Sequence, residues 1–283
     1  MAEPQEHSVC LVTGAASGIG RRMAAALRRE GHSVVAADID ESGLERLATE
    51  NAWQSEPRFT TSTLDVRSSA NWDEIVEFTV ARFGRLDVLL NIAGFLCPGN
   101  VHEMQPEVFD RHLDVNVKGV MYGTRAAARA MIPQKSGHIV NVASIAGLSA
   151  VPGLSAYCAS KHAVRGFSLS VAQELSAHGI AVTVFCPDAV ETPMLTLQER
   201  YAEAAMVFGG PRALRLPEVE AALLRVLRVR PLEVVLDVPF SARALGAKVA
   251  NAFPRLMTLA APLIIRSGRA AQKRRTRLGG VSG

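Results

Sequence analysis

The chain has 283 residues, of which 48% are hydrophobic and 20% charged, and its net charge is +4 at pH 7. This length and composition fit one large α/β unit with a substantial core. The polar start MAEPQEHS argues against a secretory signal, and no apolar run reaches the length of a membrane-spanning helix. Four scattered cysteines without C-x-x-C spacing argue against a disulfide framework or a metal site and fit a reducing, cytoplasmic compartment. His102 and His112, ten residues apart, are interpreted as surface residues.

Apolar runs that read as strands alternate with helical patterns, which predicts a parallel sheet. The predicted strands lie near residues 9–13, 33–38, 59–64, 86–91, 137–143, 180–186 and 232–238. The predicted helices lie near residues 18–30, 41–52, 69–83, 105–132, 157–177 and 218–229. Right-handed crossovers then give a Rossmann-like, doubly wound sheet of seven parallel strands with helices on both faces. Ligands of such sheets bind at the carboxyl ends of the strands. Six polar or turn-forming residues fall there: Gly14, Asp38, Asp65, Asn91, Ser144 and Pro187.

The first predicted strand leads into the glycine-rich turn TGAASGIG at residues 13–20. Glycines at 14, 18 and 20 allow close approach of a pyrophosphate, and the following helix offers free N–H groups and a positive dipole end. Asp38 closes the second strand, near the spacing at which an acidic residue binds a ribose hydroxyl. Its carboxylate repels a 2′-phosphate, so we predict NAD over NADP. Arg21 and Arg22 are the cations that would favour NADP, and a glycine-rich helix cap without a ligand is the other interpretation.

Ser144, Tyr157 and Lys161 lie in the stretch NVASIAGLSAVPGLSAYCASK. A tyrosine and a lysine at positions i and i+4 share one helix face, so the ammonium can favour the phenolate. A free tyrosine has a pKa of about 10 and is a poor acid or base at neutral pH. The spacing therefore predicts an activated tyrosine, with a serine hydroxyl to hold a substrate oxygen.

With these motifs together, the chain resembles the short-chain dehydrogenase/reductase family over roughly residues 8 to 240. The motifs are Thr13–Gly20, Asp65-Val66, Asn91-Ile92-Ala93-Gly94, Asn116, Ser144 and Tyr157-Cys158-Ala159-Ser160-Lys161. The resemblance implies that Tyr157 is the general acid in reduction and the general base in oxidation. It also implies that Lys161 lowers the pKa of Tyr157 and binds the nicotinamide ribose, that Ser144 orients the substrate, and that Asn116 holds a proton-relay water.

The resemblance also implies the residues around the cofactor. They are Gly14, Ser17, Gly18, Ile19, Gly20, Asp38, Asp65 and Val66 at the adenosine and phosphates, Asn91, Ala93 and Gly94 below it, and Pro187, Val190 and Thr192. Asp188 stands where the family usually has glycine. We expect Asp188 to be tolerated because aspartate accepts a left-handed backbone better than most residues, and to weaken binding of the reduced cofactor.

The substrate pocket should be apolar. Its expected wall consists of Leu96, Cys97, Ile145, Leu154 and the segment 194–208, where Met194, Leu197, Tyr201 and Phe208 form a helical stripe. In the family this segment is a mobile lid, although core packing also explains such a stripe. We therefore expect a hydrophobic secondary alcohol or ketone, such as a steroid-like, terpenoid or long-chain compound. The alternatives are a 3-oxoacyl thioester reductase and a nucleotide-binding scaffold without turnover.

The chain divides into a dehydrogenase domain at residues 1–239 and a basic C-terminal extension at residues 240–283. The extension carries nine Lys and Arg residues and no Asp or Glu, so the remaining 22 basic and 27 acidic residues leave the body at −5. Its apolar stretch 256–265 is too short to span a bilayer. It suits an interfacial anchor on an anionic membrane or packing against a partner subunit, whereas nucleic-acid binding is disfavoured because no aromatic residue is interleaved with the basic residues 255–277. The resemblance implies a homodimer or homotetramer.

Overall fold

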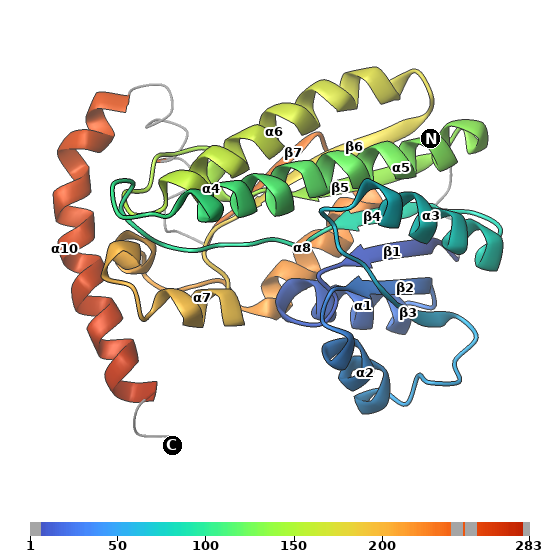
Figure 1. Cartoon of the computed structure of the whole chain (residues 1–283), viewed down its shortest axis with the longest axis horizontal. Helices are drawn as coiled ribbons and strands as arrows, with labels where there is room; N and C mark the ends of the chain where they lie inside the picture. The colour runs from blue at the N-terminus through green and yellow to red at the C-terminus, as the bar shows by residue number, and fades with distance from the viewer. Residues whose placement is uncertain (1–6, 239–245, 247–253, 280–283) are drawn as a thin grey trace.

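The computed structural model describes residues 7–238, residue 246 and residues 254–279. Its centre is one sheet of seven parallel strands in the order β3-β2-β1-β4-β5-β6-β7 (Figure 1). The strands are β1 (Val9–Thr13), β2 (Ser33–Asp38), β3 (Phe59–Thr63), β4 (Val88–Asn91), β5 (Gly137–Val142), β6 (Ile180–Pro187) and β7 (Glu233–Leu236). The predicted Rossmann-like, doubly wound fold is confirmed.

Helices connect and cover these strands. The α-helices are α1 (Gly18–Arg29), α2 (Glu41–Glu50), α3 (Ser69–Phe83), α4 (Pro106–His112), α5 (Gly119–Gln134), α6 (Ser155–Ser176), α7 (Pro193–Gln198), α8 (Leu216–Val229) and α10 (Pro254–Gly279). Shorter turns are the π-helical η1 (Leu113–Lys118) and the 3₁₀ turns η2 (Ile145–Gly147) and η3 (Ala202–Gly209). None of the described helices combines the length and the apolarity that crossing a membrane requires.

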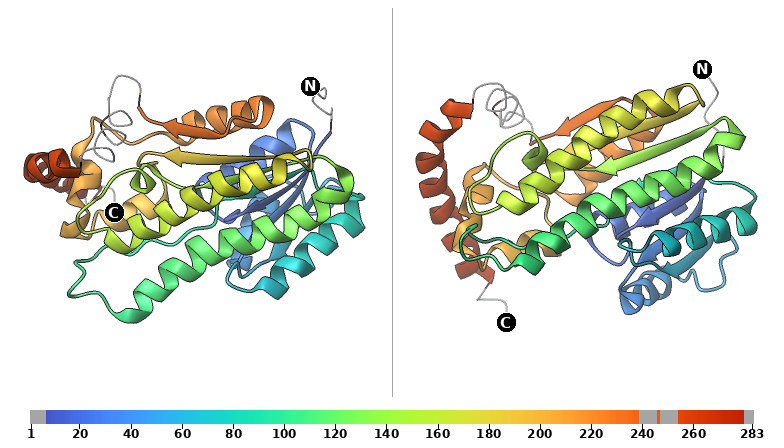
Figure 2. Two further views of the ribbon diagram at one scale, coloured as in Figure 1. Left: turned by 90° about the horizontal axis from the view of Figure 1, so that it is seen from above. Right: turned by 45° about the horizontal axis from the view of Figure 1, so that its top comes forward.

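The central strands, such as β1 and β4, are mostly apolar because both faces of the sheet are buried there, whereas the edge strand β3 consists mainly of Thr and Ser. Successive side chains point to opposite faces, so Cys10 and Val12 join a core with α1, α2 and α8, whereas Leu11 joins a core with α3, α5 and α6. The two helical layers lie on either side of the sheet in Figure 2. This sandwich places the ends of the strands, and not their faces, in reach of a ligand.

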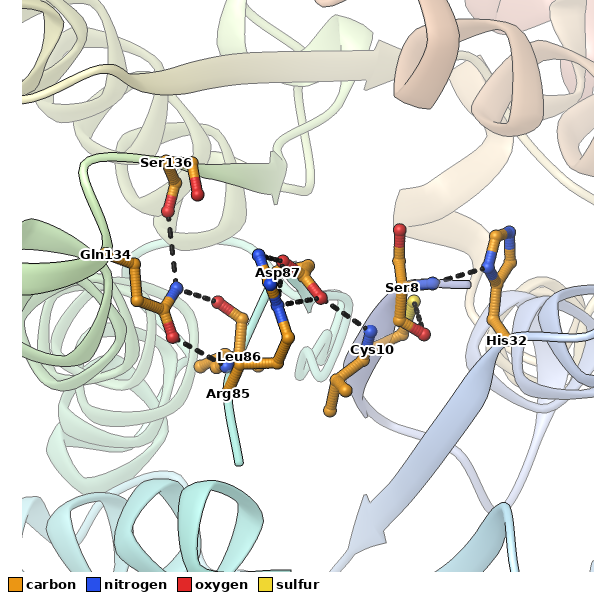
Figure 3. A network of polar contacts seen from close by, with 9 residues as sticks. Ser8, Cys10, His32, Arg85, Leu86, Asp87, Gln134 and Ser136 are labelled. Atoms are coloured by element: carbon orange, nitrogen blue, oxygen red, sulfur yellow. Dashed lines mark hydrogen bonds and ion pairs between the residues drawn. The ribbon is translucent and has the colours of Figure 1, made fainter. Parts of the chain in front are cut away.

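A polar network fastens the amino-terminal end of the sheet (Figure 3). Asp87, just before β4, accepts a hydrogen bond from the backbone N–H of Val9 at 2.9 Å and one from Arg85 Nε at 2.8 Å. The Gln134 side chain, at the end of α5, bonds both the N–H and the C=O of Leu86, at 3.0 and 2.8 Å. These contacts hold β1, β4 and α5 together at the end opposite the expected site.

Three elements differ from the sequence prediction. The single helix expected over residues 105–132 is divided into α4, the π-helical turn η1 and α5. The helical stripe expected over residues 194–208 is two short elements, α7 and η3, separated by a turn at residues 199–201. Residues 254–279 of the extension form the long helix α10, which lies beside α7 and η3 at the end towards which the strands point (Figures 1 and 2). Two of its basic residues, Arg243 and Lys248, lie outside the described residues.

Candidate active site

A cavity of about 670 Å³ opens at the carboxyl ends of the strands. The predicted site residues that line it are Gly14, Ser17, Gly18, Ile19, Gly20, Asp38, Asp65, Val66, Ala93, Gly94, Leu96, Ser144, Ile145, Leu154, Tyr157, Lys161, Pro187, Val190, Thr192 and Met194. Among the predicted catalytic and cofactor-binding residues, Asn91 and Asn116 are buried and do not line the cavity. The fold therefore brings residues from six strand ends and from α1 and α6 to one site.

The glycine-rich turn forms a cradle for an anionic group. Gly14 has a φ of +69°, and a Cβ atom there would come within 3.0 Å of the Ala93 backbone nitrogen, so the loops after β1 and β4 touch through their backbones. The first intrahelical hydrogen bond of α1 runs from the N–H of Arg21 to the C=O of Ser17. The N–H groups of Gly18, Ile19 and Gly20 precede it and are available to a ligand. This arrangement fits the pyrophosphate of a dinucleotide.

Asp38 lies at the end of β2 with its carboxylate held by the backbone. One oxygen accepts a hydrogen bond from the N–H of Ala16 at 2.9 Å and the other from the N–H of Asp40 at 3.0 Å. The carboxylate therefore has a fixed position beside the glycine-rich turn. Arg67 also lines the cavity, and it forms a two-pronged ion pair with Asp65 that lowers the pKa of that carboxyl.

The cations weighed in the sequence analysis are engaged elsewhere. Arg21 pairs with Glu50 and Arg22 pairs with Glu220, and neither arginine is among the described residues that line the cavity. Arg67 was missed. Its position two residues after Asp65, which was itself assigned to the site, is the signal that could have identified it.

Ser144, Tyr157 and Lys161 converge at the inner end of the cavity. The Ser144 hydroxyl accepts a hydrogen bond from the N–H of Ala146 at 3.1 Å and is hydrogen-bonded to the Tyr157 side chain. The Lys161 Nζ donates to the C=O of Val142 at 2.8 Å and lies 5.6 Å from the centre of the Tyr157 ring. Both Tyr157 and Lys161 are buried. A hydroxyl, a phenol and an amine thus stand together where β5 ends and α6 begins.

Burial governs the charges of these groups. It raises the pKa of the Tyr157 phenol well above its ordinary value, and the hydrogen bond with Ser144 opposes this by less. Burial also lowers the pKa of the Lys161 ammonium to about 8. Lys161 was expected to lower the pKa of Tyr157. In the structure this pKa is raised instead, because the burial of the phenol outweighs the effect of the nearby amine.

Asn116 fastens the loop that forms the floor of the site. Its side-chain oxygen accepts a hydrogen bond from the N–H of Phe95 at 2.7 Å, and its amide nitrogen donates to the Phe95 C=O at 2.8 Å and to the Ser160 Oγ at 2.9 Å. Asn91 likewise donates to the side chain of Asn141 at 2.8 Å. Asn116 therefore joins the loop after β4 to α6, and Asn91 joins the end of β4 to β5.

Two expectations from the sequence are wrong. His112 is not a surface residue but is fully buried, with its Nδ1 donating to the Val108 C=O at 2.7 Å and its Nε2 accepting from the Cys97 N–H at 3.2 Å. Its position at the end of α4, just before η1, turns it inward. Asp188 lines the cavity, but it is not among the described residues with positive φ. Asp188 is accepted because this turn needs no left-handed backbone.

The rest of the wall is mostly apolar. Of the predicted stripe, Met194 lines the cavity, whereas Leu197 is exposed and Tyr201 and Phe208 pack in a separate apolar cluster. Cys97 is not among the described lining residues. Gln198, Met206 and Val207 line the cavity from within the expected segment 194–208, whereas the sequence analysis missed Phe95, Arg111 and, from α10, Ile264. Ile264 could have been identified from the three- and four-residue spacing of small and apolar residues in the extension.

The fold and this site define a class of protein, a nucleotide-dependent dehydrogenase or reductase. A family model described as short chain dehydrogenase matches residues 8–202. The chain is 38% identical over 202 residues to a 3-oxoacyl-[acyl-carrier-protein] reductase of Thermotoga maritima, covering 71% of this chain and 82% of that protein. It is 39% identical over 189 residues to (+)-borneol dehydrogenase 2 of Salvia officinalis, covering 66% of each.

Solved structures agree. Levodione reductase superposes with a TM-score of 0.75 at 27% identity, covering 84% of this chain and 98% of that one. ElxO with NADP bound superposes with a TM-score of 0.73 at 25% identity, covering 81% and 97%. The chain belongs to the short-chain dehydrogenase family. It is an oxidoreductase that acts on CH–OH and C=O groups, and its family uses a nicotinamide cofactor.

Proposed function

We propose that this enzyme interconverts a hydrophobic secondary alcohol and its ketone with NAD as cofactor. One observation carries the proposal. The hydroxyl, phenol and amine of Ser144, Tyr157 and Lys161 share a cavity with the Asp38 carboxylate, and the wall beside Tyr157 is apolar, with Leu96, Leu154 and Met194 among its residues. Such a pocket favours an uncharged substrate whose bulk is apolar.

In this proposal each polar residue has one task. A nicotinamide held at this cavity would supply the hydride to the substrate carbon in reduction and accept it in oxidation. Tyr157 gives a proton to the substrate oxygen in reduction and takes it back in oxidation. Ser144, held by the Ala146 N–H and hydrogen-bonded to Tyr157, orients that oxygen. Lys161 supplies positive charge that stabilises the phenolate left behind. Asn116 holds the loop under the cofactor in place.

The preference for NAD rests on Asp38. A 2′-phosphate would approach a carboxylate that two backbone N–H groups already fix in place. Arg67 is the nearby cation that could favour NADP, but it is paired with Asp65. NADP is bound in the ElxO structure, which belongs to a relative at 25% identity. The cofactor preference therefore needs a direct test.

The test is a fluorescence titration of NADH and NADPH into the wild type and Asp38→Ala. We expect wild type to bind NADH at least about tenfold more tightly, a difference of about 1.4 kcal/mol. Asp38→Ala should lose most of that preference. Tighter NADPH binding by wild type would contradict the preference for NAD, and binding of neither nucleotide would contradict the proposed function.

The alternative substrate is a 3-oxoacyl thioester, which the resemblance to the Thermotoga maritima reductase favours. A panel of 2-alkanols, borneol and a hydroxysteroid with NAD⁺, set against a 3-oxoacyl thioester with NADH, separates the two. A kcat/KM for the thioester above that of every free alcohol and ketone would replace our proposal with this alternative.

We further propose that the outer face of α10 rests on an anionic membrane. Four basic residues of that face are exposed: Arg266, Arg269, Lys273 and Arg274. Leu263 beside them is 73% exposed. Each basic residue near an anionic surface contributes about 1 kcal/mol. Wild type should sediment with anionic vesicles at low salt, and replacing all four by Gln should abolish this. Wild type that stays in the supernatant would refute the proposal.

We also propose that the enzyme is a homodimer or homotetramer assembled through α5 and α6. The support is the resemblance of these long helices to those that form four-helix interfaces in the family. Light scattering on the purified full chain measures the mass directly, and a monomer at micromolar concentration would contradict this assembly.

A further inference from the structure

Helix α10 packs against its own chain along one stripe. The less exposed positions of its described part recur every three or four residues: Ala261, Ile264, Ile265, Gly268, Ala271, Gln272 and Arg275. This period is that of one helix face. The basic residues considered above occupy the other face. The extension, seen in the sequence as a tail for a membrane or a partner, therefore uses its inner face within the enzyme.

The inner face of α10 packs so closely against η3 that there is no room for a side chain between the two backbones at Gly268. A Cβ atom added to Gly268 would lie 1.9 Å from the C=O oxygen of Ala205, and one added to Gly209 would lie 2.7 Å from the Ile264 Cγ2. A glycine on each element thus lets the two backbones touch. Ala271 adds to this contact by packing on the apolar cluster that contains Leu195 and Phe208.

Gln272 caps the end of α7. Helix α7 ends at Gln198, and the last carbonyls of a helix have no donor within it. The Gln272 amide nitrogen supplies one, at 3.1 Å from the C=O of Gln198, 3.2 Å from that of Glu199 and 2.8 Å from that of Tyr201. Gln272 is only 7% exposed, so these hydrogen bonds are shielded from water. Arg275 adds an ion pair with Glu199 at 2.9 Å.

The segment that α10 holds is a wall of the substrate cavity. Met194, Gln198, Met206 and Val207 line the cavity from this segment, and Ile264 lines it directly from α10. Ile264 lies in the first part of the described stripe, four residues before the Gly268 contact. The C-terminal helix therefore reaches the cavity both through its own side chain and through the segment beneath it.

We propose that α10 is a built-in wall of the substrate pocket, in which Ile264 determines substrate size and Gln272 is a positioning residue for the segment 193–209. This rests on the proposed function, since it concerns the size of the alcohol or ketone. It assigns a task to the extension that depends on neither a membrane nor a partner subunit.

The size test uses Ile264→Ala and Ile264→Phe with ketones from 2-butanone to 2-dodecanone and camphor, with NADH. Removing part of a pocket wall changes discrimination by roughly tenfold or more. We expect Ile264→Ala to raise kcat/KM for the largest ketones at least about fivefold relative to 2-butanone, and Ile264→Phe to lower it. Leu263→Ala, on the exposed side, is the control and should leave the ratio unchanged. An unchanged ratio in both Ile264 variants overturns the assignment of Ile264.

The positioning test does not need turnover. Gln272→Glu keeps the size of the side chain but removes the donor, and Gln272→Ala removes both. Amide hydrogen exchange in residues 193–209 should accelerate at least about tenfold in both variants, with NADH affinity unchanged, and Lys273→Ala should match wild type. Unchanged exchange overturns the role of Gln272. If wild type reduces no ketone, the proposed function fails while the exchange result still decides whether α10 holds this segment.

Discussion

Tyr157 and Lys161 share one buried corner of the cavity, and burial acts on them in opposite directions. It keeps the phenol protonated to high pH and makes the ammonium easier to deprotonate, with a pKa of about 8. Reduction needs a protonated Tyr157 as donor and a charged Lys161 to stabilise the phenolate that remains. The residue that titrates first as the pH rises is therefore the lysine and not the tyrosine.

This order of titration predicts the pH profile of reduction. With NADH and a ketone, kcat should be level near neutral pH and fall above about pH 8, approaching tenfold per pH unit as Lys161 loses its charge. Lys161→Met should have a low kcat without this limb, and Lys273→Met, on the exposed face of α10, should retain it. A wild-type kcat that rises between pH 8 and 10 would contradict the assignment of Lys161.

Residues with a local signature were predicted well from the sequence. Gly14 and Asp38 follow strands at known offsets, and the structure places both at the cavity. His112 was not predicted, because its burial depends on Phe95 and Tyr157, whose rings lie 4.8 and 6.4 Å from it and come from other elements. A left-handed backbone was expected at Asp188 because the family usually has glycine at this position. The residue type alone does not show whether that backbone is kept when another residue replaces the glycine.

The π-helical turn η1 is the element that places Asn116. A π-turn inserts one residue into a helix and redirects the side chains that follow. Asn116 thereby meets the backbone of Phe95 and the hydroxyl of Ser160. It connects the loop after β4 to α6, which carries Tyr157 and Lys161. The geometry of the site thus depends on a contact between three elements.

Asn116→Ala should therefore destabilise the fold as well as the site. It leaves the N–H and C=O of Phe95 without their partner, at a cost of about 3 kcal/mol, which corresponds to a fall in Tm of roughly 8 °C. Asn100→Ala, which removes an exposed hydrogen bond to Glu103, should change stability by less than about 0.5 kcal/mol. Thermal unfolding of both variants measures the difference, and equal Tm values would show that the Phe95 contacts contribute little.

The central strands were the most predictable elements because they are mostly apolar runs that both helical layers bury. The element that escaped prediction is α10. Its inner face is formed by Gly268 and Gln272, which look polar or neutral in sequence and become contacts only against η3 and the end of α7. The break between α7 and η3 was also missed, because the spacing of apolar residues does not show where the backbone hydrogen bonds of a helix end.

At the scale of the whole molecule, a buried histidine makes the stability of the fold depend on pH. His138 is buried in β5, and its Nε2 lies 2.9 Å from the Thr183 hydroxyl, which itself donates to the Pro231 C=O. Nε2 is therefore the protonated nitrogen. Nδ1 is buried without a hydrogen-bond partner among the described residues. A second proton would bury a charge with nothing to accept its hydrogen bond, and burial accordingly lowers the pKa of His138 to about 3.

The sign of the resulting pH dependence follows from proton counts. Between about pH 6.5 and 3 the unfolded chain binds a proton at His138 that the folded chain does not, so the free energy of unfolding decreases as the pH falls through this window. One such group contributes a slope of up to about 1.4 kcal/mol per pH unit.

In urea unfolding between pH 6.5 and 4.5, the free energy of unfolding of His138→Gln should have a pH slope smaller by about this amount, whatever the stability of this variant at neutral pH. His178→Gln, at an exposed position, should keep the wild-type slope. His112, whose pKa burial also lowers, acts in the same direction and remains in both variants, so the wild-type slope should exceed what His138 alone explains. Equal slopes in wild type and His138→Gln would mean that the fold opens enough to solvate this histidine before it unfolds.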